Sequence, residues 1–515
     1  MNASKQVIIN ASAHEIPLPA GMVHTVCTSP PYYSLRRYSG EQEVDWPSME
    51  YYQMPGQMLP LIVDPMRCAL GLEPTPEAYI GHLVLCFREV ARVLREDGTA
   101  WVVMGDSYAA NRSYQVTDSK WVDVGNSHGQ QTPSGLQQGD LMLIPHRLAL
   151  ALQGDGWLVR NDAVWHKKAP MPASVSGWRW ERCKTKVKAG WDGDHPSKRH
   201  GGVSGAIAQS GGIATGKREG VATWHPCPGC DKCSSTGGYV LRRGSWRHTR
   251  AHETVLMLAR SMGYYADQER VREAANEGTD LGLLRGAHAG EDHNDLVSCH
   301  AKSIKARQDA GVDSRRGNPS GKRNPRSVLT PKPSSYKGAH YAVFSPTLIS
   351  PLLRATAPTR VCPVCGAPWC PVVERETAPD SVFTASKNDD GRYSRTMKGG
   401  TVGHGQKLQD WRDAHPSQTI AHRPTCDHVW ADPESYGGPN DAGQFPEPDR
   451  PLAPIPGWCL DPFAGTGTTL EVCAELGVNA VGLDISPQYL DEHAKPRIGL
   501  TPSGALDELP LFEGM

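Results

Sequence analysis

The sequence predicts an α/β domain with a mostly parallel sheet, because apolar strands alternate with amphipathic helices and with glycine or proline breaks. The clearest unit is residues 79–95, which place apolar side chains at helical spacing, stop before Asp97-Gly98 and lead into a buried strand at 99–106. The further predicted elements are strands at 7–10 and 22–27, a helix at 141–152, and strands at 158–167 and 252–261. Such alternation is typical of parallel strands joined by crossovers.

Length and composition limit the class of protein. The chain has 515 residues and 38% hydrophobic content, which at about 100–200 residues per domain predicts one large domain with insertions or two to three domains. It contains no run of about 18 apolar residues and no apolar signal segment at its start, so we expect a cytoplasmic protein with no membrane partner. Three stretches, 184–223, 275–338 and 380–455, have little apolar periodicity and are expected to be long or partly disordered loops.

The charge of the chain is unevenly distributed. The net charge is −1, from 54 Lys and Arg against 55 Asp and Glu. Residues 160–250, however, hold 17 basic against 6 acidic residues, and residues 300–360 hold 12 against 2. Two basic stretches in an acidic chain are compatible with a groove for a polyanion or with solvated tails. The near-neutral total therefore does not exclude a nucleic-acid partner.

A glycine-rich stretch near the C-terminus indicates a bound cofactor. An apolar strand leads into it, and a second strand follows the helix after it. Glycines allow close backbone approach to a ligand, and a carboxylate after the second strand can accept hydrogen bonds from ribose hydroxyls. No Lys follows the glycines and an acid precedes them, which favours S-adenosylmethionine over a nucleotide diphosphate; a purely structural glycine turn is the alternative. The candidate cofactor-binding residues are Asp461, Phe463, Gly465, Gly467, Thr468 and Asp484.

A second motif, Ser29-Pro30-Pro31-Tyr32, directly follows the strand at 22–27. Two prolines fix φ and lack N–H groups, so we expect a stiff loop whose carbonyls face outward as acceptors. Such a loop suits an exocyclic amine, with carbonyls and the Ser29 hydroxyl accepting its N–H groups and the Tyr32 ring stacking on the base. The alternative is an ordinary Pro-Pro turn with aromatic packing.

Together the two motifs resemble the amino-methylating DNA methyltransferases, whose sequences carry (D/N/S)PPY and FxGxG loops. The Ser-Pro-Pro-Tyr loop precedes the glycine loop, as in the circularly permuted β class of that family. The resemblance implies a Rossmann-like S-adenosylmethionine-dependent methyltransferase fold with a mixed seven-stranded sheet. It makes 252–261 the single antiparallel strand and gives Phe344 a part in enclosing the cofactor. At a position where relatives often carry an acid, this chain has Ser12.

The resemblance also implies a reaction. Its substrate is double-stranded DNA, from which the target base is flipped into the pocket, and Cys27, which lies in the strand, has no covalent role. The TSPPY form is associated with cytosine N4, and adenine N6 remains the alternative. The family further implies a bacterial, archaeal or phage-encoded protein, which a cognate restriction enzyme can accompany.

Of the 14 cysteines, two groups have metal-ligand spacing. Cys227, Cys230 and Cys233 are separated by two residues each, and Cys183 is the first choice for a fourth ligand, with His225 as the alternative. The second group consists of Cys362, Cys365, Cys426 and His428, and Cys370 and His422 are the alternative ligands there. Both groups are interpreted as structural zinc sites, one or two in number. Their candidate ligands are Cys183, Cys227, Cys230, Cys233, Cys362, Cys365, Cys426 and His428.

The first cysteine group lies within the basic stretch at 160–250, so we expect a zinc-braced DNA-reading insertion there. Its candidate DNA-binding residues are Arg242, Arg243, Arg247 and Arg250, for which a solvated basic face is the alternative. The predicted division of the chain is a catalytic half at 1–180, a basic zinc-braced insertion at 181–250, a returning strand and helix at 251–274, a basic flexible loop at 275–338, a cofactor-enclosing helix at 339–360, a zinc ribbon at 361–430, a linker at 431–456, a cofactor-binding half at 457–500 and a tail at 501–515.

Two other classes of protein compete with a DNA methyltransferase. A non-catalytic zinc-containing DNA-binding protein would not need intact SPPY and FAGTG loops. Enzymes that methylate a protein glutamine or RNA usually carry NPPY after the cofactor loop, so both Ser29 and the motif order oppose that reading.

Overall fold

A computed structural model describes residues 4–33, 36–37, 42–109, 115–116, 135–170, 176–187, 223–274, 322–331, 344–374, 418–428 and 453–499. Most of the three long loops expected from the sequence, including the basic flexible loop at 275–338, lies outside the described residues. In the part that is described, no helix is long and apolar enough to span a membrane.

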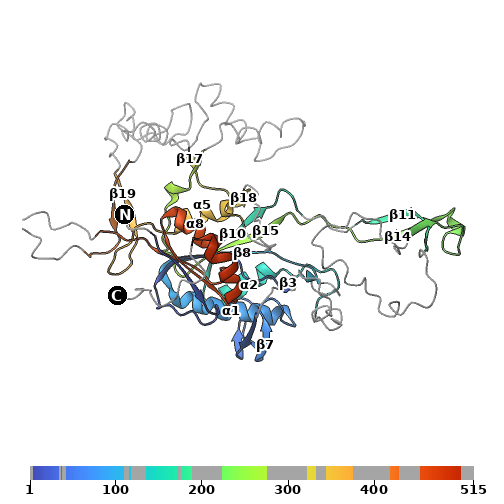
Figure 1. The fold of residues 1–515 in the computed structure, drawn as a ribbon, viewed down its shortest axis with the longest axis horizontal. Helices are drawn as coiled ribbons and strands as arrows, with labels where there is room; N and C mark the ends of the chain where they lie inside the picture. The colour runs from blue at the N-terminus through green and yellow to red at the C-terminus, as the bar shows by residue number, and fades with distance from the viewer. Residues whose placement is uncertain are drawn as a thin grey trace, which may run out of the picture.

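The centre of the molecule is one mixed sheet (Figure 1). In spatial order its strands are β1 (Gln6–Asn10), β22 (Asn479–Asp484), β21 (Trp458–Asp461), β2 (Val23–Thr28), β8 (Leu94–Met104), β15 (His252–Ala259), β10 (Leu158–His166) and β18 (Val328–Leu329). β15 is antiparallel to both of its neighbours, and the other paired strands are parallel. The predicted mixed sheet and its antiparallel strand are thus confirmed, with the two-residue β18 as an additional edge strand.

Helices cover both faces of the sheet, and each face has its own apolar core. One core contains α1 (Pro76–Val93) and α2 (Ile144–Gly154), and the other contains α5 (Pro346–Thr356) and α8 (Thr468–Leu476). α1 begins after Thr75, whose side chain accepts from the Ala78 amide, and Pro76 occupies its first turn. Burial of these faces against the sheet fixes where the loops at the strand ends lie.

Two expected boundaries differ from the structure. α1 runs directly into β8 at Leu94, so Asp97-Gly98 lies inside the strand and does not precede it. The close packing at this position favours glycine, because a Cβ on residue 98 would lie 2.6 Å from the Leu94 side chain. After β15 the expected helix is absent, and the described residues there form only a 3₁₀ turn at Gln268–Arg270 and the short strand β16 (Glu273–Ala274). The segment 260–272 lacks sustained helical periodicity, which explains this difference.

The remaining elements are small and peripheral. Hairpin-like pairs are β4 (Glu43–Trp46) with β7 (Met66–Ala69), β5 (Met49–Tyr51) with β6 (Leu61–Val63), β11 (Trp178–Arg182) with β14 (Tyr239–Arg243), β12 (Lys184–Val187) with β13 (Thr223–Pro226), and β19 (Trp369–Glu374) with β20 (Gln418–Pro424). Two-residue pairs are β3 (Arg36–Arg37) with β9 (Gln115–Val116), and β16 with β17 (Lys322–Arg323). Short helical turns are Ser234–Thr236, α9 (Pro487–Tyr489), Leu490–Ala494 and α10 (Lys495–Arg497).

The strand directions place the Ser-Pro-Pro-Tyr loop and the glycine loop at the same edge of the sheet. β2, β21, β22, β8 and β10 run parallel, so their carboxyl ends meet at one edge, and β15 begins there. The segment between β10 and β15 therefore leaves the sheet from the edge that also carries the Ser-Pro-Pro-Tyr and glycine loops. In Figure 1 the described part of this segment, with β11 and β14, extends away from the sheet as a long arm, whereas β19 lies on the other side of the molecule.

Candidate functional site

A single pocket at the carboxyl edge brings the two sequence motifs together. It encloses about 1080 Å³ of empty space including its open mouth. Ser29, Pro30, Pro31 and Tyr32 line one side. The other side is lined by Pro462, Phe463, Ala464, Gly465, Thr466, Thr468, Asp484, Ile485 and Tyr489, with Phe344 and Trp46 completing the wall. The two motifs are more than 400 residues apart in sequence and share one cavity because β2 and β21 are neighbours.

The glycine loop is held by the acid at the end of β22. Asp484 accepts from the Gly465 amide at 3.1 Å and from the Ser486 amide at 2.9 Å, and burial raises its pKa. These bonds leave the carboxylate at the pocket wall, where further lone pairs can accept from a ligand. Phe344, 8% exposed, lies just before α5 and closes the same end. The site residues predicted from the sequence at this end include five that line the pocket: Phe344, Phe463, Gly465, Thr468 and Asp484.

Two further residues predicted to bind the cofactor, Asp461 and Gly467, are not among those that line the pocket, and their contact with the cofactor stays a prediction. Asp461 is 1% exposed and accepts from Thr28 Oγ1 at 2.7 Å, Thr469 Oγ1 at 2.6 Å and the Phe463 amide at 3.1 Å. The Asp461 carboxylate thus ties β2 and α8 together behind the loop, and burial raises its pKa to about 6. Gly467 has φ +76° and makes the turn into α8, close to the Ala494 backbone.

The Ser-Pro-Pro-Tyr loop is anchored from two sides. The Pro31 carbonyl accepts from the Tyr79 hydroxyl of α1 at 2.6 Å, so it faces inward, in contrast to the expected outward acceptors. The Tyr32 hydroxyl donates to Glu253 Oε2 of β15 at 2.9 Å, and Glu253 Oε1 in turn binds Lys167 Nζ. Gly105, at the end of β8, lies so close that an added Cβ would be 2.6 Å from the Tyr32 ring. The ring is therefore fixed in orientation at the pocket wall.

Trp46 is a pocket residue without a sequence signal. Its indole stacks on the His82 imidazole at 4.2 Å between ring centroids and 7° between planes. His82 Nδ1 pairs with Glu73 Oε1 at 2.9 Å, and both side chains are fully buried. Cys68 lies near enough to form a third possible metal-ligating group with these two residues. Glu73 also accepts from the Gly71 amide at 2.7 Å. Within the described part of the chain, His82 Nε2 is buried without a hydrogen-bond partner.

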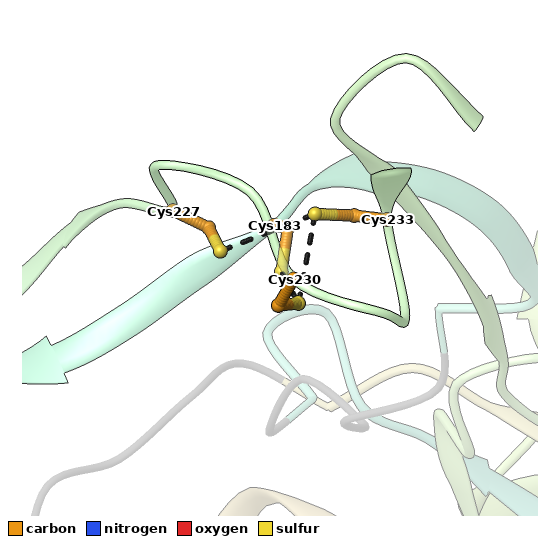
Figure 2. Close-up of side chains that lie close together, drawn as sticks. All are labelled: Cys183, Cys227, Cys230 and Cys233. Atoms are coloured by element: carbon orange, nitrogen blue, oxygen red, sulfur yellow. Dashed lines mark hydrogen bonds between the residues drawn. The ribbon is translucent and has the colours of Figure 1, made fainter. Parts of the chain in front are cut away.

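The four side chains of the first cysteine group lie close together in the arm (Figure 2). The sulfur atoms of Cys183, Cys227, Cys230 and Cys233 all lie within 4.8 Å of one another, with Cys183–Cys230 at 3.8 Å, Cys230–Cys233 at 3.6 Å and Cys227–Cys233 at 3.9 Å. Four thiolates around Zn²⁺ at about 2.3 Å would be about 3.8 Å apart. The set therefore fits a closed tetrahedral zinc site, and His225, the alternative ligand, is not part of it.

The environment of Cys227 favours the thiolate that a metal needs. Backbone N–H of Gly229, with the Thr185 hydroxyl, lowers the pKa of Cys227 to about 7. In the same group burial raises the pKa of Cys183 to about 12, so the contacts favour the thiolate at Cys227 and not at every sulfur.

The second cysteine group lies at the opposite edge of the sheet. Cys362, Cys365, Cys426 and His428 come within 4.8 Å of one another, whereas the competing Cys370 and His422 lie on β19 and β20 outside the group. Its knuckle is held by His24 at the start of β2, whose Nε2 bonds the Gly366 carbonyl at 2.8 Å. Burial lowers the pKa of His24 to about 4, so the ring is neutral, Nε2 donates, and Nδ1 accepts from the Trp458 amide. This group is remote from the pocket and fits a structural metal.

The four candidate arginines occupy different environments along the arm. Arg250, at its base, pairs with the buried Asp106 at 3.3 Å, and Arg247 lies over the Tyr108 ring at 3.7 Å. Arg243 lies over Trp178 at 5.1 Å, and Arg242 pairs with Glu181 at 3.5 Å. Arg247 and Arg250 thus contact the residues that follow β8, whereas Arg242 and Arg243 contact side chains of β11.

A Rossmann-like sheet whose carboxyl edge joins an FxGxG loop and a Pro-Pro-Tyr loop around one pocket defines a methyltransferase-type α/β protein. The chain belongs to the N6/N4 DNA methylase family, whose family model, described as "DNA methylase", matches residues 23–360 and 454–495.

Individual relatives match parts of the chain. It is 31% identical over 366 residues to the Type II methyltransferase M.SfiI of Streptomyces fimbriatus, covering 66% of this chain and 77% of that protein. It is 41% identical over 159 residues to M.XycI of Xanthomonas campestris pv. cyanopsidis and 38% identical over 159 residues to M.Cfr9I of Citrobacter freundii. These two matches each cover 31% of this chain and 44% of the relative, so the chain matches less than half of the length of either.

Proposed function

We propose that this protein transfers a methyl group from S-adenosylmethionine to the exocyclic amine of a base flipped out of duplex DNA, with cytosine N4 as the target atom. The observation that carries the proposal is the shared pocket, in which Ser29–Tyr32 face the glycine loop and Asp484. S-adenosylmethionine supplies an electrophilic methyl group when bound. The chain supplies position, which is the main contribution an enzyme makes to a direct transfer between two bound partners.

The cofactor end of the pocket fits a nucleoside. Asp484 can accept from ribose hydroxyls, and Phe344 offers an apolar wall. Ser12, where relatives often have an acid, also lines the pocket and is bonded to His14 Nδ1 at 2.6 Å. Ser12 can still meet a polar edge of the ligand through its other hydrogen-bonding capacity.

The substrate end fits a flat ring that carries an amine. Tyr32, held by Glu253, offers a ring face for stacking, and the Ser29 hydroxyl lies beside it as an acceptor. Hydrogen bonds from the amine to such acceptors raise the electron density on the nitrogen and aim its lone pair at the methyl group of the cofactor. No residue needs to form a covalent bond with the base. Cys27 is fully buried and burial raises its pKa well above the usual value, which suits a core thiol.

We further propose structural zinc at both cysteine groups and contact between the arm and DNA. The sulfur geometry of Cys183, Cys227, Cys230 and Cys233 supports the first site. The arm leaves the edge that carries the pocket, so DNA bound along it would present a base to that pocket. The relatives named Type II methyltransferases favour a role beside a cognate restriction enzyme.

The test is incubation of the purified protein with methyl-labelled S-adenosylmethionine and unmethylated duplex DNA, followed by digestion to nucleosides. We expect label in N4-methylcytosine. Label in N6-methyladenine would show that the target is adenine and not cytosine, and the reaction class would stand. No label in DNA of varied sequence would overturn the proposal, and label in RNA or protein would favour a different substrate class.

A further inference from the structure

The two strands β11 and β14 form a ribbon whose two faces differ in chemistry. In an antiparallel pair, directly opposed residues point to the same face. The pairs Trp178–Arg243, Trp180–Leu241 and Arg182–Tyr239 therefore make one face, called here the aromatic face. Arg179–Arg242 and Glu181–Val240 make the opposite one, called here the ion-pair face.

The ion-pair face neutralises much of its own charge. Glu181 accepts from Arg179 at 2.6 Å and pairs with Arg242 at 3.5 Å, and its hydrogen bond to Arg179 lowers the pKa of the Glu181 carboxyl. Arg179 and Arg242 thus share one carboxylate. A phosphate or a base would compete with Glu181 for both guanidinium groups.

The aromatic face carries cations that are free of acids. Among the described residues, neither Arg182 nor Arg243 has a salt bridge, and each lies over a ring of its cross-strand partner, Tyr239 at 5.3 Å and Trp178 at 5.1 Å. The rings themselves are exposed, with 68% for Trp178, 57% for Trp180 and 38% for Tyr239. This cation–π contact holds each guanidinium beside its ring while its N–H donors stay available.

Exposed aromatic rings on a ribbon without a covering layer indicate a binding surface. A two-stranded ribbon gains little stability of its own, and this one ends in the Cys183, Cys227, Cys230 and Cys233 group, which a metal would lock. Leaving three large rings in water serves no packing purpose within the described structure. The combination of rings with unpaired arginines suits a polyanion that also offers flat base edges.

We propose that the aromatic face is the surface that enters the major groove of the duplex to be methylated and reads its sequence, whereas the ion-pair face points away from the bases. The inference rests on the proposed function and specifies its DNA-reading surface. The major groove is about 12 Å wide and admits a two-stranded ribbon, and extended arginines are its commonest base readers. Of the arginines predicted to bind DNA, this assigns Arg243 to base contact and Arg242 to the ion pair.

The test compares glutamine substitutions on one strand and its partner. Arg182→Gln and Arg243→Gln remove charge from the aromatic face and keep a polar side chain, and Arg179→Gln is the matched control on the ion-pair face. The substrate is unmethylated genomic DNA, and the readout is the rate of methyl transfer at limiting DNA. We expect each aromatic-face variant to lose about tenfold or more, as a lost base contact of about 1.4 kcal/mol or more implies, and the control to stay within about twofold.

The outcomes separate the inference from the proposed function. Zinc content and S-adenosylmethionine affinity equal to wild type establish that each variant is folded. If wild type transfers methyl groups and all three variants behave alike, the face assignment is wrong while the function stands. Single-stranded DNA that competes as well as duplex would also overturn it, because exposed rings would then be stacking on unpaired bases. If wild type transfers nothing to DNA, the proposed function itself fails.

Discussion

At the scale of residues, the geometry of the pocket depends on side chains that are not among those lining it. Glu253 receives the Tyr32 hydroxyl on one oxygen and Lys167 on the other, and it lies on the antiparallel strand β15. Glu253 is therefore a positioning residue, which fixes the ring face that the base would meet. Asp461 has a similar part at the other loop, where it joins Thr28 to Thr469.

Substitution Glu253→Gln tests the positioning role. The change keeps the volume but removes the charge that attracts Lys167 and strengthens the Tyr32 hydrogen bond, a bond type worth about 1.5–3 kcal/mol. We expect the maximal rate of methyl transfer to fall about tenfold or more with unchanged S-adenosylmethionine affinity. The maximal rate of Tyr32→Phe should fall by a similar factor, and the rate of the double variant should be no lower than that of the slower single variant. Additive losses would contradict a shared role.

Asp461→Asn tests the buried carboxyl through pH. Because the folded-state pKa of Asp461 is raised to about 6, its contribution to stability is fully present below the unfolded pKa and is lost as pH rises through the folded pKa. Between pH 5 and 7 the wild type should therefore lose about 1 kcal/mol of unfolding free energy relative to Asp461→Asn. Chemical denaturation at both pH values measures the difference, and a relative gain by the wild type would show that burial does not dominate.

At the scale of elements, the two cysteine groups serve different parts of the fold. The first closes an arm that has little packing of its own, and the second lies beside the amino ends of β2 and β8, where Arg95 donates to the Cys365 carbonyl at 2.7 Å. Loss of metal should therefore have separate consequences at the two places.

Removal of one ligand from each group tests this separation. We expect wild type to contain about two zinc ions and Cys230→Ser and Cys426→Ser each to lose one. Cys230→Ser should weaken DNA binding while S-adenosylmethionine affinity is kept, and Cys426→Ser should lower the unfolding temperature of the sheet domain. Elemental analysis gives the zinc content. A wild type without zinc would contradict both sites, and loss of S-adenosylmethionine binding in Cys230→Ser would contradict the independence of the arm.

At the scale of the whole molecule, features that depend on local sequence patterns could be predicted, whereas features that depend on long-range contacts could not. The mixed sheet and its antiparallel strand followed from apolar runs and from the resemblance carried by two motifs. The ligand groups followed from spacing within short segments, such as Cys227, Cys230 and Cys233. Trp46 and Glu253 could not be found in this way, because their places depend on which strands become neighbours, and nothing near them in sequence marks a pocket.

The inward orientation of Asp461 shows the same limit. The sequence places an acid before the glycines, but only the packing of β2 against β21 decides that its oxygens are taken by Thr28, Thr469 and the Phe463 amide. Asp461 therefore braces the two halves of the permuted domain, and its predicted contact with the cofactor stays a prediction.

The central claim is that one pocket has a cofactor end and a substrate end. The S-adenosylmethionine dissociation constant of Tyr32→Ala, measured by calorimetry, tests it most directly. We expect a value within about threefold of wild type, although methyl transfer is abolished, because Tyr32 belongs to the substrate end. Asp484→Ala, from the cofactor end, is the comparison and should weaken binding by tenfold or more, as loss of about 1.4 kcal/mol implies. A loss of affinity in Tyr32→Ala as large as that in Asp484→Ala would contradict the division.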